Sequence, residues 1–120
     1  MIQITEWQMQ ALNDACDVRR ATRIARAMRK FFADRFSGHT DEQTHAFALQ
    51  CLNQARLRGL RTEGEAHRYA NLAALLGIGF EDTPAAHDTG LAPRAVEVPG
   101  IWLRRVGDRV EQMLREREKR

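Results

Sequence analysis

Three helix-start signals divide the first two-thirds of this chain. A threonine is followed three residues later by glutamine or glutamate at Thr5–Gln8, Thr40–Gln43 and Thr62–Glu65. In each pair, the hydroxyl and the longer polar side chain can each bond the other residue's backbone N–H, an arrangement called a capping box. Each pair also precedes apolar residues at helical spacing. The sequence therefore predicts three helix starts, one directly after each threonine.

The second and third predicted helices are joined by a tight turn. The second should span residues 41–58 and end at Gly59, where a helix C-terminus favours a residue that tolerates the left-handed conformation. The third should span residues 63–76, and Gly77 would end it. These signals predict an antiparallel helix hairpin centred on Gly59. The inward-facing residues of its first helix should be Phe47, Ala48, Cys51, Leu52 and Ala55.

The first predicted helix, residues 6–36, carries apolar residues on two faces. One face holds Met9, Leu12 and Cys16, whereas Ala21, Ile24 and Met28 share a face about 120° away at 100° per residue. A straight helix cannot point both stripes at one core. Either the helix breaks near residues 13–17, or its two halves pack against different elements or different molecules.

The last third of the chain has fewer signals. Residues 77–99 contain all three prolines and predict an irregular loop, whose length indicates mobility or a binding role. A last helix should begin near Ile101 and reach Glu116 or beyond, and residues 115–120 should be a frayed end. Its narrow apolar seam, suited to lying along another helix, consists of Leu103, Val106, Val110 and Met113.

Length and composition fit one domain comprising residues 1–120. The chain has 120 residues, of which 43% are hydrophobic and 29% charged, as in ordinary globular proteins. No apolar run is long enough to span a membrane, and the first residues lack the pattern of a signal peptide. We therefore expect an all-α fold, a helical bundle of four to five helices around the central hairpin, located in the cytoplasm.

Cysteine and histidine give no metal or cofactor motif. Cys16 and Cys51 lie on separate predicted helices, and a cytoplasmic location favours small buried or half-buried thiols over a disulfide. The four histidines are scattered, without metal-binding spacing. We expect neither a bound metal nor a cofactor.

Positive charge is concentrated in residues 19–35, which carry six arginines and one lysine against one aspartate. Arg19, Arg23, Arg26 and Lys30 recur at spacings of four, three and four and form a basic ridge on the predicted first helix. The simplest interpretation is the solvated face of an amphipathic helix. The functional alternatives are an acidic protein partner and, less favoured, nucleic acid or a membrane surface.

A DNA-binding helix-turn-helix is disfavoured. Gly59 could occupy the turn position of such a motif. Several positions that the motif must bury would then hold charged side chains, namely Arg58, Glu65 and Arg68.

Catalytic residues are not expected. Glu63 and Glu65 already serve as negative charges at a helix N-terminus, which leaves Asp82 without a catalytic companion. Ser37 is the sole serine and has no base beside it, and Gly77 and Gly79 follow a helix instead of opening one as a phosphate loop does. The sequence favours a protein that is not an enzyme.

Aromatic residues supply further candidates for recognition. Trp7 and Trp102 lie near helix starts, where an indole ring can be partly exposed and act as an interface anchor, although each ring taken alone is more often part of the core. Tyr69 and Phe80 are expected in the core.

Residues 59–84 resemble a family of small helical proteins encoded beside type VI secretion genes in proteobacteria, whose pattern reads roughly YGI-x-SERDVARYIDLMFLLGPDFD-x-xP. A weaker match extends upstream through residues 8–12 and 23–32. This sequence departs from the pattern at Gly64, at His67 and at the glycine after Ile78. The matching residues are Gly59, Leu60, Thr62, Glu63, Glu65, Arg68, Tyr69, Leu72, Leu76, Gly77, Phe80 and Pro84.

The resemblance implies a protein partner, either a secreted effector or the adaptor that loads it. We therefore expect a non-enzymatic accessory protein that acts like a chaperone. The alternatives are an immunity protein that neutralises a cognate toxin, a nucleic-acid-binding regulator and a protein of lipid surfaces.

Overall fold

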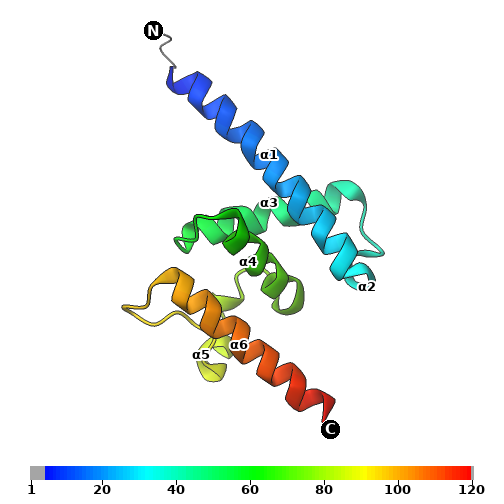
Figure 1. Ribbon diagram of the computed structural model, residues 1–120, viewed down its shortest axis with the longest axis vertical. Coiled ribbons are helices and arrows are strands. Elements are labelled where there is room, and N and C mark those ends of the chain that lie inside the picture. Colours follow the sequence, from blue (N-terminus) through cyan, green and yellow to red (C-terminus); the bar gives the residue numbers. More distant parts are fainter. Residues whose placement is uncertain (1–4, 120) are drawn as a thin grey trace.

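The computed structural model describes residues 5–119. These residues form six α-helices and one 3₁₀ turn, without a β-strand in the described part (Figure 1). The predicted all-α class is therefore confirmed, although two of the helices are short. In chain order the elements are α1 (Glu6–Phe31), α2 (Ala33–Phe36), α3 (Asp41–Leu57), α4 (Glu63–Leu76), η1 (Phe80–Asp82), α5 (Pro84–Thr89) and α6 (Pro99–Glu118).

All three predicted capping boxes are present with both of their hydrogen bonds. At the start of α4, for example, Glu65 N–H donates to Thr62 Oγ1 at 3.1 Å, and Thr62 N–H donates to Glu65 Oε1 at 3.1 Å. Because each box uses groups only three residues apart, these helix starts do not depend on the rest of the fold.

Gly59 forms the turn of the predicted hairpin and has φ of +81°. The N–H of Gly59 donates to Arg56 O and the N–H of Leu60 donates to Ala55 O, both at 2.9 Å, which is the Schellman pattern of a helix C-terminus. Leu60 then folds back into the core. A Cβ at residue 59 would also lie 2.9 Å from Cγ of Pro99, so the turn and the start of α6 approach too closely for a side chain.

Helix α4 occupies the middle of the molecule, with α1 and α3 on one side of it and α6 on the other (Figure 1). Four of the five residues predicted to face inward from α3 are buried, whereas Phe47 is half-buried. On α6, three residues of the predicted seam are buried, and Met113 at its end is half-buried. The helix remains regular to Glu118, further than the frayed end expected from residue 115.

Helix α1 is unbroken from Glu6 to Phe31, so the break considered near residues 13–17 does not occur. The helix ends instead at Phe32, which has φ of −127° and ψ of 43°. This turn starts α2 and carries Phe36 into the core, where its ring packs edge-on against Phe47 at a centroid distance of 5.1 Å. The predicted end of the first helix at residue 36 is therefore wrong.

The segment of residues 77–99 is more ordered than the irregular loop predicted for it. Phe80 opens η1, and α5 begins at Pro84 with Thr83 as its N-cap. Ala86 N–H donates to Thr83 Oγ1 at 3.2 Å, and proline suits the first helical position because its missing N–H would have no partner there. The segment also contributes Phe80, Ala86 and Leu91 to the core.

Candidate partner-binding surface

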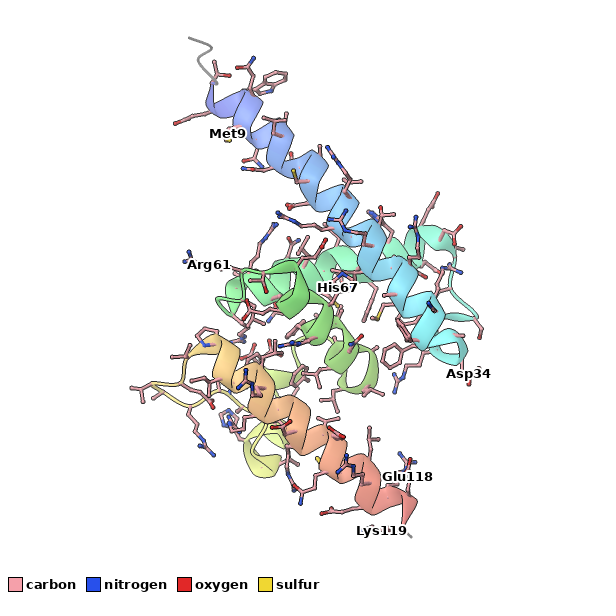
Figure 2. The ribbon with its side chains drawn as sticks, viewed as in Figure 1. Met9, Asp34, Arg61, His67, Glu118 and Lys119 are labelled. Atoms are coloured by element: carbon pink, nitrogen blue, oxygen red, sulfur yellow. The ribbon has the colours of Figure 1, made fainter. Side chains whose placement is uncertain are left out.

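The N-terminal part of α1 extends away from the rest of the molecule (Figure 1). Residues 6–16, which we call the arm, are all exposed. The exposed side chains of the arm include apolar ones, with exposed fractions of 78% for Trp7, 48% for Met9 and 53% for Leu12. Figure 2 shows Met9 on this projecting part of α1. The projection fits the radius of gyration, 16.3 Å, against about 14 Å for a typical 120-residue domain.

The arm is amphipathic, but its apolar side faces away from the body. At 100° per residue, most of its polar residues lie on the side of the helix that is buried further along by Ala21, Ile24 and Met28. Asp17 marks this side, since its carboxylate accepts a hydrogen bond from Arg56 of α3 at 2.8 Å. The stripe of Met9, Leu12 and Cys16 lies about 120° from this side and is therefore directed away from the core of its own chain.

The basic ridge continues the line of three apolar residues on the arm. Because α1 is unbroken, Met9, Leu12 and Cys16 are followed by the four basic residues at alternating spacings of three and four. All seven side chains are exposed. We call this line the α1 seam; it consists of Met9, Leu12, Cys16, Arg19, Arg23, Arg26 and Lys30.

Only one of the four cations in the seam has an ion-pair partner among the described residues. Arg23 Nη2 lies 2.5 Å from Glu63 Oε1 at the N-terminus of α4. Lys30 Nζ lies 5.4 Å from the centre of the Phe31 ring, a cation–π contact on the surface. Arg19, Arg26 and Lys30 therefore leave three positive charges open to solvent or to a partner.

The two tryptophans differ in their exposure. Trp7 is exposed on the arm and remains a candidate for partner contact. Trp102 is only 1% exposed, stacks on Phe80 with a ring-centroid distance of 6.1 Å, and donates from Nε1 to Leu91 O at 3.0 Å. The expectation that Trp102 contacts a partner is therefore wrong, because its ring is part of the core and its N–H holds the segment before α6.

Most residues that match the family pattern have a structural role. Tyr69 and Phe80 are buried, as predicted, and their rings stack at a centroid distance of 5.7 Å. Leu72 is buried as well, whereas Arg68 and Leu76 are exposed. At the start of α4, hydrogen bonding from the Thr62 backbone lowers the pKa of Glu65. Residues 59–84 thus build the hairpin, whereas the exposed side of α1 falls partly within the weaker upstream match.

A buried carboxylate, Glu81, was missed by the sequence analysis. Its Oε1 accepts hydrogen bonds from Gln54 Nε2 at 2.9 Å and from Arg58 Nε at 3.0 Å, while Tyr69 Oη lies 2.9 Å from Oε2. A sequence signal existed in Gln54 and Arg58, which are four residues apart at the C-terminal end of the predicted second helix and would therefore share one of its faces. No buried side-chain polar atom in the described chain lacks a partner, so this network is satisfied and structural.

The two cysteines are free thiols in different surroundings. Cys51 is buried in the core, and burial together with the nearby Glu81 raises the pKa of its thiol to about 12. Cys16 is exposed in the α1 seam. The prediction that both thiols are at least half-buried is therefore wrong for Cys16, because the arm that carries it does not pack on the body.

No other kind of site is evident in the described part of the chain. Within residues 5–119, no group of three His, Cys, Asp or Glu residues is placed to hold a metal ion. In the same residues, no helix combines the length and apolar character needed to cross a bilayer. A shallow groove of about 570 Å³ lies between α1 and α3, but its charges are already partly paired, since Arg29 Nη2 lies 2.8 Å from Asp41 Oδ1.

Comparison with known proteins adds no further assignment. No family model, curated protein or solved structure matches this chain. The type VI secretion setting thus stays a prediction from the resemblance of residues 59–84.

Proposed function

We propose that this chain is a non-enzymatic, cytoplasmic protein-binding module that holds a protein partner along the exposed side of α1. The supporting observation is the arm, a helical segment whose apolar side is directed away from its own core. Clustered apolar side chains on a surface are typical of protein interaction sites. The module would thus recognise its partner by burying the apolar side of a helix.

We further propose that the partner is a secreted effector of a type VI system or the adaptor that loads it. The support for this setting is the sequence resemblance alone. In this role the module would stabilise or deliver the effector before secretion, as a chaperone does.

The experiment that tests this function is co-purification of the tagged chain with the product of a neighbouring effector gene, from cells that express both. The wild-type chain and Gln10→Glu, an equal change of charge on the exposed polar side of the arm, should both retain the effector. Leu12→Glu should lose it, because a charge would be placed in the apolar side. Equal retention by all three proteins would refute the role of the arm.

The same cells separate the accessory role from the immunity role. An accessory protein should bind the effector without relieving its toxicity. Rescue of growth in cells that express the toxic effector would instead assign this chain as its immunity protein.

A further inference from the structure

We propose that the occupant of the α1 seam is an acidic, amphipathic helix that lies antiparallel to α1. This inference rests on the proposed protein-binding function and names the chemistry and the direction of the partner. The first observation is the spacing of the seam. Its seven residues are alternately three and four positions apart, over three heptads of α1. At 1.5 Å per residue the seam is about 32 Å long. Such spacing matches the a and d positions by which one helix packs along another.

The chemistry of the seam changes at one point along its length. Its first three residues offer apolar or thiol surface, whereas its last four are cations, three of them without an ion pair in the described chain. A partner helix must therefore bring apolar residues to Met9, Leu12 and Cys16. It must also bring carboxylates to the basic part, because uncharged residues there would remove cations from water without compensation.

The direction follows from the electrostatics of the partner helix itself. A helix prefers negative side chains near its N-terminus, where the backbone N–H groups are unpaired. An antiparallel partner would begin with its carboxylates over Lys30 and Arg26 and end with its apolar residues over Met9. A parallel partner would have to carry the same carboxylates at its C-terminal end, where the helix dipole disfavours them.

Two synthetic peptides of 24 residues test this inference. Both carry four glutamates and three leucines at consecutive a and d positions, with identical remaining residues. The acid-first peptide begins with the glutamates, and the leucine-first peptide has the reverse order. We expect the acid-first peptide to bind the full chain about tenfold or more tightly than the leucine-first peptide, as measured by calorimetry. A third peptide, with lysine in place of glutamate, should not bind.

Variants of the protein then locate the contact. Arg26→Glu combined with Lys30→Glu should weaken binding of the acid-first peptide by about tenfold or more, because two attractive charge pairs become repulsive. Arg23 is left unchanged, since it already pairs with Glu63. The matched control is Arg94→Glu combined with Arg117→Glu, which makes the same change in net charge at exposed positions away from α1. This control should bind as the wild type does.

Cys16 gives a second readout within the seam. Bound acid-first peptide should slow modification of this exposed thiol by 5,5′-dithiobis(2-nitrobenzoic acid), whereas the lysine peptide should not. Unchanged modification in a saturated complex would show that the peptide lies elsewhere and would overturn the inference.

Three further outcomes would overturn the inference. The first is equal affinity for the two peptide orders, and the second is undiminished binding by the Arg26/Lys30 double variant. The third is failure of the acid-first peptide to bind while anionic phospholipid vesicles or duplex DNA bind through these same two residues. None of these outcomes contradicts the proposed function, which fails only if effector capture is insensitive to Leu12→Glu.

Discussion

The phenolic oxygen of Tyr69 on α4 lies 2.9 Å from Oε2 of Glu81 in η1, and both side chains are buried. The same phenolic oxygen accepts the N–H of Gly79 at 3.1 Å. Gln54 of α3 and Arg58, the C-cap residue of α3, complete the contacts of the carboxylate. This one side chain therefore joins α3, α4 and the segment after α4, which also buries Phe80.

Replacement of Glu81 by alanine should destabilise the protein by about 3–5 kcal/mol, because Tyr69 and Gln54 would lose their carboxylate partner. Of its two ion pairs, Arg58 would keep only the one with Asp82. Urea unfolding followed by circular dichroism measures this loss. Asp82→Ala is the control, since Asp82 also pairs with Arg58 but is exposed, and it should cost less than about 1 kcal/mol. Equal losses for the two variants would contradict a buried role for Glu81.

Gly59→Ala should lower the free energy of unfolding more than Gly79→Ala does. Both glycines have positive φ, +81° and +78°, so each alanine incurs about 1–2 kcal/mol of backbone strain. Only at residue 59 would the new Cβ also meet Pro99, at 2.9 Å. We expect Gly59→Ala to lower the free energy of unfolding by about 2–4 kcal/mol in total, as measured by thermal and urea unfolding. A smaller loss at residue 59 than at residue 79 would show that Pro99 moves aside.

Acid should weaken the attachment of the segment before α6, because protonation of Glu97 removes its ion pair with Arg105. Paired hydrogen bonds from Arg105, at 2.7 and 2.8 Å, lower the pKa of Glu97 from its ordinary 4.5 to about 2. Because the folded-state pKa is the lower one, the stabilisation is fully present above pH 4.5 and is lost as the pH falls toward 2. Its size is about 1–2 kcal/mol, since Arg105 remains partly open to water.

Glu97→Gln tests this linkage. We expect the wild type to lose about 1–2 kcal/mol more than the variant between pH 6 and pH 3, as followed by urea unfolding at each pH. Glu42→Gln, at an exposed position, should retain the wild-type pH dependence. If Glu97→Gln also retained it, the Arg105 contact would contribute nothing to acid sensitivity.

The two thiols should react at very different rates. With 5,5′-dithiobis(2-nitrobenzoic acid) at pH 8, Cys16 should be modified rapidly in the native protein, because it is exposed. Cys51 should react only on unfolding, since it is buried and a pKa of about 12 keeps it protonated. Cys16→Ser should abolish the rapid phase and leave one slow equivalent. Two rapid equivalents in the native wild type would contradict the burial of Cys51.

The sequence was informative wherever the determining groups are close along the chain. The capping boxes at Thr5, Thr40 and Thr62 and the turn at Gly59 each depend on groups within about five residues of one another. It was less informative for residues 77–99. There, the N-cap Thr83 and Pro84 at the first helical position were a local signal for α5 that the density of glycine and proline obscured.

The candidate surface was only partly predictable. The basic ridge and the apolar stripe of the arm could each be read from helical spacing. Their union into one seam required knowing that α1 is continuous through residues 13–17. The exposure of Trp7 and the burial of Trp102 depend on which helix has a neighbour, and helical spacing alone contains no such information.

The sequence by itself therefore determined the three capped helix starts and the turn at Gly59, because capping and turn hydrogen bonds are local. The observed end of α1 and the short helices α2 and α5 were not among its predictions. The tertiary structure decided which side of each helix is covered. It buries Ala21, Ile24 and Met28 of α1 and leaves Leu12 on the same helix in water. The physical reason is that burial depends on neighbours distant in the chain: α3 and α4 pack beside the second half of α1, and the arm extends beyond them.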